Sequence, residues 1–206
     1  MAKEKFDVSF LRQSAKSAVG APVHKVVSNT ESSIRTFLKS VPAGSILVAE
    51  HTGVYGERLL KMCTDMNVKI AYVGGHVIHT YKAGPDRGKT DELDCSLLRE
   101  FGERFTDRLR LATFPTEAIY ELQQLSRQRT MLVEERKRVA TADKAEECRP
   151  YRSETVRRSM RNLMDMLDEE IRDIEKAMLD IIGKDEGLSN SYDIITSVNG
   201  VGLVTA

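Results

Sequence analysis

The sequence predicts an α/β domain followed by a long helical hairpin, and three observations carry this prediction. First, strand-like and helix-like segments alternate over residues 1–112. Second, glycines and strand patterns vanish between about residues 116 and 182, where only Pro150 interrupts a helical pattern. Third, apolar residues in the second half of that stretch recur at heptad-like steps. A chain of 206 residues is long enough for one sizeable domain with an appendage.

The first region reads as strands alternating with helices. Residues 5–10 alternate polar and apolar side chains, whereas residues 45–49 form a continuous apolar run that ends at Glu50, as in a buried strand. Ile34, Phe37 and Leu38 recur at helical spacing after Thr30, which can cap a helix. In chain order, we expect strands at 5–10, 24–27, 45–49 and 68–73, and helices at 31–40, 52–67 and 90–105.

The helical stretch predicts two long helices that fold back on each other near residues 140–152. The second helix carries a seam with one slip in register, made of Val156, Met160, Leu163, Leu167, Ile171, Ile174, Met178 and Ile181. The first helix has a weaker stripe: Ile119, Leu122, Leu125, Leu132 and Val139. Coiled-coil packing is favoured for the second helix, and an ordinary bundle stripe stays open for the first. The helices could pack on each other or on a second chain, and a homodimer is therefore expected.

Charge is balanced overall, with 31 Lys plus Arg against 31 Asp plus Glu, so bulk charge predicts no nucleic-acid partner. Locally, residues 126–161 hold 11 basic and 6 acidic side chains, whereas residues 162–182 hold 2 and 7. A basic hairpin tip attracts phosphate backbones, although charge on a coiled coil is often only a solvated face. The candidate nucleic-acid contacts here are Arg136, Lys137, Arg138, Arg157 and Arg158.

Cysteine usage and hydropathy exclude other classes of protein. Cys63, Cys95 and Cys148 are far apart and form no CxxC pair, which argues against a disulfide framework or a zinc finger. The first residues are too polar for a signal peptide, and no apolar run reaches membrane-spanning length. These features predict a soluble cytoplasmic protein with no membrane partner.

Four carboxylates stand at positions that suit a metal site. Asp7 lies in the first predicted strand, Glu50 directly follows a buried one, and Asp91 and Asp94 share one face of a helix. Any one of them has an ordinary structural explanation, such as a helix start at Thr90. Together they supply the oxygen ligands that Mg²⁺ or Mn²⁺ prefers, and such ions catalyse phosphoryl transfer. Spacing alone leaves open whether the four converge.

The residues around these acids resemble a known family. Glu50-His51-Thr52-Gly53-Val54-Tyr55 is similar to the E-(A)-T-G-x-Y signature of the insertion sequence 110 transposases, also called DEDD or Piv/MooV-type. The stretch that begins at Lys89-Thr90-Asp91 resembles the family's K-T-D-x-x-D-A-x-x-L motif, and Phe6-Asp7-Val8-Ser9 its opening D-V-S strand. The order of the motifs and the helical region after them agree as well, so the resemblance covers essentially the whole chain.

The resemblance implies a RuvC-like, ribonuclease-H-type domain over residues 1–112, a coiled-coil hairpin over 113–185, and the start of a C-terminal domain over 186–206. It implies that Asp7, Glu50, Asp91 and Asp94 are catalytic metal ligands and that the partner is DNA, with a guide RNA in some members. Excision and insertion of a bacterial or archaeal element would then also use a serine beyond residue 206. Residues 194–206 resemble the hairpin of a helix-hairpin-helix element that the chain leaves incomplete.

Departures from the family pattern concern the shape of the site. His51 stands where a small residue is usual, Cys95 where alanine is usual, and Val73-Gly74-Gly75 where Asn-Pro is common. His51 is either a partner of Glu50 or a structural residue, and Lys89 is either a phosphate contact or an exposed lysine. A DNA invertase, a RuvC-like nuclease that uses water, and a non-catalytic nucleic-acid-binding or dimerisation module remain the alternative functions.

Overall fold

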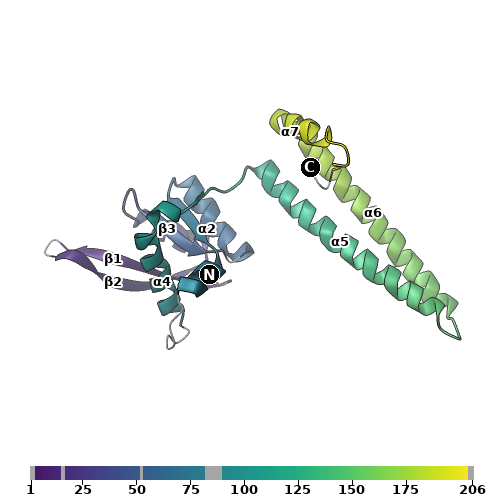
Figure 1. The fold of residues 1–206 in the computed structure, drawn as a ribbon, viewed down its shortest axis with the longest axis horizontal. Coiled ribbons are helices and arrows are strands. Elements are labelled where there is room, and N and C mark those ends of the chain that lie inside the picture. The colour runs from purple at the N-terminus through teal and green to yellow at the C-terminus, as the bar shows by residue number, and fades with distance from the viewer. Residues whose placement is uncertain (1–2, 15–16, 52, 82–89, 204–206) are drawn as a thin grey trace. The chain divides into compact units, whose positions relative to one another are not determined.

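The computed structural model describes residues 3–14, 17–51, 53–81 and 90–203 (Figure 1). The chain divides into two compact units, Met1–Phe114 and Pro115–Ala206. The first unit mixes strands and helices, and the second is helical. The predicted α/β class with a long helical C-terminal part is confirmed.

The strands of the first unit form two small sheets. Strands β1 (Lys5–Ser14) and β2 (Ser17–Ser28) pair as an antiparallel hairpin, in which Asp7 lies opposite Val26 and Ser9 opposite His24. Strands β3 (Ile46–Glu50) and β4 (Lys69–Val73) pair in parallel, and the short β5 (Leu111–Ala112) pairs antiparallel with β4. The parallel pair results from the β-α-β order, because a helix connects β3 to β4.

The helices of this unit begin where the sequence offers a cap. Thr30 and Thr90 each accept a hydrogen bond from the backbone N–H three residues later, at the starts of α1 and α4. Acidic residues in the first turn of α4 add to this, because carboxylates favour the positive end of a helix. The helical segments are α1 (Glu31–Lys39), α2 (Val54–Asp65), α3 (Gly75–Tyr81), α4 (Asp91–Arg104) and the 3₁₀ turn η1 (Thr106–Arg108).

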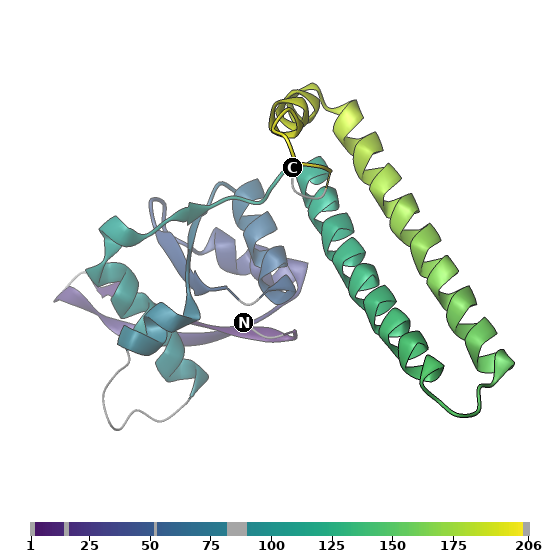
Figure 2. The same cartoon turned by 45° about the vertical axis from the view of Figure 1, so that its right-hand side comes forward.

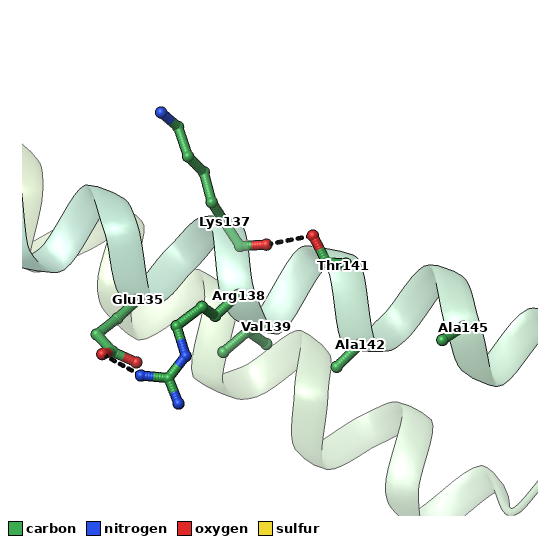
Figure 3. A pocket seen from close by; sticks show the side chains of 7 residues that line it. All are labelled: Glu135, Lys137, Arg138, Val139, Thr141, Ala142 and Ala145. Carbon is green, nitrogen blue, oxygen red and sulfur yellow. Dashed lines mark hydrogen bonds and ion pairs between the residues drawn. The ribbon is translucent and has the colours of Figure 1, made fainter.

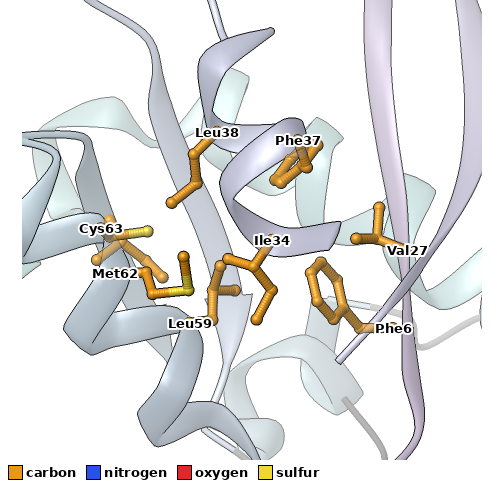
Figure 4. Close-up of a cluster of buried hydrophobic side chains, with 9 residues drawn as sticks. Phe6, Val27, Ile34, Phe37, Leu38, Leu59, Met62 and Cys63 are labelled. Carbon is orange, nitrogen blue, oxygen red and sulfur yellow. The ribbon is translucent and has the colours of Figure 1, made fainter. Parts of the chain in front are cut away.

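The main core lies where α1 and α2 meet the strands (Figure 4). The rings of Phe6 and Phe37 meet edge-on with centroids 6.2 Å apart, which ties β1 to α1. The buried cluster consists of Phe6, Val27, Ile34, Phe37, Leu38, Leu59, Met62, Cys63 and Ile70. On α4, a Cβ added at Gly102 would lie 2.7 Å from Cγ2 of Val48, so glycine lets this helix approach β3 closely.

The second unit is built on an antiparallel helical hairpin. Helices α5 (Glu117–Glu147) and α6 (Glu154–Lys184) run side by side in both views (Figures 1 and 2). Two ion pairs cross between them: Arg129 Nε lies 2.6 Å from Glu175 Oε1, and Arg136 Nε lies 2.5 Å from Asp168 Oδ1. The turn between the helices is residues 148–153, at the end of the predicted range of 140–152.

The contact seam of α6 differs from the predicted one in its distal half. Val156 and Leu163 are 39% and 40% exposed, whereas Met164 is half-buried and Leu167 is 6% exposed. The seam therefore runs from Met160 through Met164 to Leu167 and keeps alternating steps of four and three residues. The predicted slip in register was wrong, because Met164 takes the inward position that Leu163 was expected to fill.

Two helices lie where no helix was specifically expected. Helix α3 begins at the Gly74-Gly75 pair, and α7 (Glu186–Thr196) follows α6 with Asp185 as its cap. After α7 the chain turns, and Gly200 takes a positive φ of 89°, a conformation that favours glycine. No helix in the described part of the chain has the length and apolar character to cross a membrane.

Candidate active site and nucleic-acid interface

Asp7 occupies the middle of β1, and its carboxylate is held by a histidine from β2. Oδ1 of Asp7 lies 2.8 Å from Nε2 of His24, and the Asp7 side chain is only 14% exposed. His24 stands two residues from Val26, the register partner of Asp7, so both side chains project from the same face of the hairpin. Sequence reasoning missed His24, because its proximity depends on strand register.

The same face of β1 packs against α4. Ser9 Oγ accepts a hydrogen bond from Arg99 Nε at 3.3 Å and lies 3.5 Å from Ser96 Oγ. Burial raises the pKa of the Cys95 thiol, and the nearby charge of Asp7 adds to this increase. Asp7 is therefore close to the residue that directly follows Asp94.

Asp91 and Asp94 lie in the first turn of α4. Asp91 is exposed and Asp94 half-buried. Thr90 fixes where this turn begins, through the hydrogen bond from the N–H of Leu93 to its hydroxyl. The first turn of α4 thus carries two carboxylates, and Cys95, which senses the charge of Asp7, directly follows the second of them.

Glu50 is the last residue of β3, where it lies opposite Val73 of β4, and it is exposed. A Cβ added at Gly75 would lie 2.5 Å from Oε1 of Glu50, so the carboxylate rests directly over this glycine. Gly75 begins α3, and its lack of a side chain leaves room for Glu50 at the carboxyl end of the parallel strands.

His51 turns to the loop that leads into α2. Its Nδ1 accepts a hydrogen bond from the N–H of Gly53 at 3.4 Å, and its ring meets Tyr72 edge-on at 5.4 Å. Gly53 has a positive φ of 59°, a conformation that glycine adopts without steric cost. Of the two roles considered for His51, these contacts favour the structural one.

The donor chemistry of the four acids fits a hard divalent cation, because all are carboxylates. Within the ranges that the structure describes, however, no three or more His, Cys, Asp or Glu side chains group closely enough to hold a metal ion. The fold brings Asp7 beside α4, which carries Asp91 and Asp94, and sets Glu50 at the end of the neighbouring sheet. The described part of the chain thus supplies ligand types that suit the ion, but no group of three close ligands.

The predicted nucleic-acid contacts on the hairpin fall into two groups. Arg136, Arg138 and Arg157 pair with Asp168, Glu135 and Glu154, respectively. The bond to Asp168 raises the pKa of Arg136 and lowers the pKa of that carboxyl. In the described part of the chain, Lys137 and Arg158 have no ion-pair partner. Lys89 lies outside the described residues.

A hollow of about 630 Å³ runs along α5 beside these cations. Figure 3 shows the ion pair between Arg138 and Glu135, and Lys137 extends from α5 on the side away from this pair. Its lining residues are Glu135, Lys137, Arg138, Val139, Thr141, Ala142 and Ala145. Lys137 is the lining cation that has no ion-pair partner among the described residues.

The comparison with protein families agrees with the motifs. A transposase family model, that of the DEDD transposases of insertion sequence 110, matches residues 1–144 and so includes all four acids. No curated protein matches the chain. Membership implies an enzyme that binds, cleaves and recombines DNA, and the family typically uses divalent metal ions. Because the match spans well over half of the 206 residues, the chain belongs to the insertion sequence 110 family of DEDD transposases.

Proposed function

We propose that this transposase cleaves and exchanges DNA strands with the help of Mg²⁺ or Mn²⁺ held by Asp7, Glu50, Asp91 and Asp94, in a RuvC-like domain of residues 1–112. The observation that carries this proposal is the packing of α4 against β1. The face of β1 that carries Asp7 contacts α4, and α4 begins with Asp91. The family match over the same residues supports it.

In this proposal the protein's own residues hold and orient the reacting groups. When bound, the metal supplies Lewis-acid stabilisation of charge on a scissile phosphate. His24 holds one oxygen of Asp7, and the glycine at position 75 leaves the Glu50 carboxylate room. Lys137 and Arg158, which have no ion-pair partner among the described residues, would contact the phosphate backbone of DNA or of a guide RNA.

We also propose a homodimer, but one that does not form through the predicted seam of α6. The seam of α6 packs on α5 of the same chain, so it is already occupied. A dimer formed through the hairpin would instead use outer side chains such as Val156 and Met166, which are 39% and 51% exposed.

Mn²⁺ binding tests the proposed site. Electron paramagnetic resonance of free Mn²⁺ measures the affinity of the wild-type chain and of the Asp7→Asn and Asp91→Asn variants. We expect both variants to lose binding. Asp65→Asn is the matched control, because Asp65 is an exposed acid paired only with Lys61 in the described structure. Unchanged Mn²⁺ affinity in both site variants would contradict the assignment.

A further inference from the structure

The turn of the helical hairpin carries an aromatic ring that no packing explains. Tyr151 lies between the end of α5 and the start of α6 and is 91% exposed, more than any other large hydrophobic residue that stands exposed in the described part of the chain. Single exposed apolar residues are common on proteins. This one differs from them in its charged surroundings.

The turn is basic and contains no acid of its own. Residues 148–153 include Arg149 and Arg152 and no Asp or Glu, and residues 144–161 hold six basic against three acidic side chains. Lys144 and Arg158 have no ion-pair partner among the residues that the structure describes. The segment that carries Tyr151 therefore has an excess of positive charge that its acidic residues do not fully neutralise.

Local contacts hold the turn in a defined shape. Arg149 Nε lies 2.6 Å from Glu146 Oε1, and Arg152 donates from its guanidinium to the carbonyl oxygen of Glu147. Both arginines are thereby directed back to the end of α5. Pro150 limits the backbone between them, because its ring fixes φ. Ordering Tyr151 on binding thus requires little further loss of backbone freedom.

We propose that Tyr151 is a stacking platform for an unpaired nucleobase, with the basic side chains of the turn neutralising the adjoining phosphates. Aromatic rings beside cations bind single strands in this way, and a paired base cannot offer its face. The inference rests on the proposed nucleic-acid function and adds a binding site and a ligand class to it. The ligand chemistry, an unpaired base on a phosphodiester chain, is common to DNA and RNA.

Fluorescence anisotropy with labelled single-stranded DNA, single-stranded RNA and duplex DNA tests the proposal. We expect Tyr151→Ala to weaken single-strand binding about ten-fold or more, the loss expected for one stacked base, while duplex affinity stays unchanged. Tyr151→Phe should retain wild-type affinity, because the ring is kept. Leu179→Ala is the matched control, since Leu179 is a 44% exposed apolar residue on the acidic half of α6. The DNA and RNA strands show which nucleic acid is preferred.

A direct optical signal comes from Tyr151→Trp, because the chain contains no tryptophan. Its emission should be quenched by single strands and unaffected by duplex DNA. Equal single-strand affinity in Tyr151→Ala and wild type, or no quenching, overturns the stacking site and leaves the transposase function standing if duplex DNA still binds. Failure of the wild-type chain to bind any of the three nucleic acids overturns both.

Discussion

The Nε2 atom of His24 and the Oδ1 atom of Asp7 lie 2.8 Å apart across the β1-β2 hairpin. This contact joins a proposed metal ligand to a side chain that fixes its orientation, and partners of this kind tune metal sites strongly. In the described structure only one oxygen of Asp7 is engaged in this way, which leaves the other for a ligand.

The first prediction concerns this pair. His24→Leu should lower Mn²⁺ affinity by about ten-fold, because loss of a partner that orients a ligand costs roughly this much. His24→Gln should restore most of the affinity, since its amide N–H can reach the same carboxylate. Lys25→Leu, at an exposed position whose side chain projects from the other face of β2, is the control. Equal affinity in His24→Leu and wild type would exclude a positioning role.

The second prediction concerns Gly75. In Gly75→Ala the new methyl group would lie 2.5 Å from Oε1 of Glu50, so the carboxylate must move. We expect weaker Mn²⁺ binding with little change in melting temperature, because the end of an exposed side chain shifts at low cost. Gly183→Ala is the control, since its methyl group would meet nothing within 4 Å. Calorimetric titration with Mn²⁺ compares them, and a drop in affinity in both variants would argue against a specific effect at Glu50.

The third prediction separates the two possible seams of α6. Leu167→Ala should cost about 2–5 kcal/mol of unfolding free energy, because Leu167 is 6% exposed and its removal leaves a cavity. Leu163→Ala should change stability by no more than about 0.5 kcal/mol, since Leu163 is 40% exposed. Urea unfolding followed by circular dichroism measures both. If both variants lost the same unfolding free energy, the predicted seam through Leu163 would be supported instead.

The fourth prediction is a loss of stability in alkali. Burial raises the pKa of the Cys63 thiol from 9.0 to about 12. The unfolded chain ionises this thiol above about pH 9, whereas the folded chain keeps it protonated, so stability is fully present below that pH and falls as pH rises toward 12. The slope is at most about 1.4 kcal/mol per pH unit. Urea midpoints at several pH values should show a smaller alkaline loss in Cys63→Val, and an identical loss would refute the assignment.

The spacing of apolar residues predicted the helices and strands that bury one regular face or a continuous apolar run. Strand β3 and helices α1 and α4 follow from apolar spacing and from caps at Thr30 and Thr90. The seam of α6 could not be settled in this way. Leu163 and Met164 are both apolar and adjacent, and the choice between them depends on how α6 faces α5, where Arg136 pairs with Asp168.

For the candidate site, the sequence predicted which residues could be ligands but not which side chains orient them or make room for them. Acids at strand ends and on one helical turn can be recognised from spacing, and the motif around Glu50 identifies the family. His24 could not be recognised, because 17 residues separate it from Asp7 and only the hairpin register brings them together. The room that Gly75 leaves for Glu50 is likewise a property of the folded chain.

The most direct test of the proposed metal centre is paramagnetic broadening of backbone amide signals by substoichiometric Mn²⁺ in nuclear magnetic resonance spectra of the chain. The proposal predicts that signals around residues 7, 50 and 91–94 broaden together, whereas those of the acidic half of α6, residues 165–180, do not. Broadening confined to residues 91–94, or centred on the acidic half of α6, would contradict a shared site of Asp7, Glu50, Asp91 and Asp94.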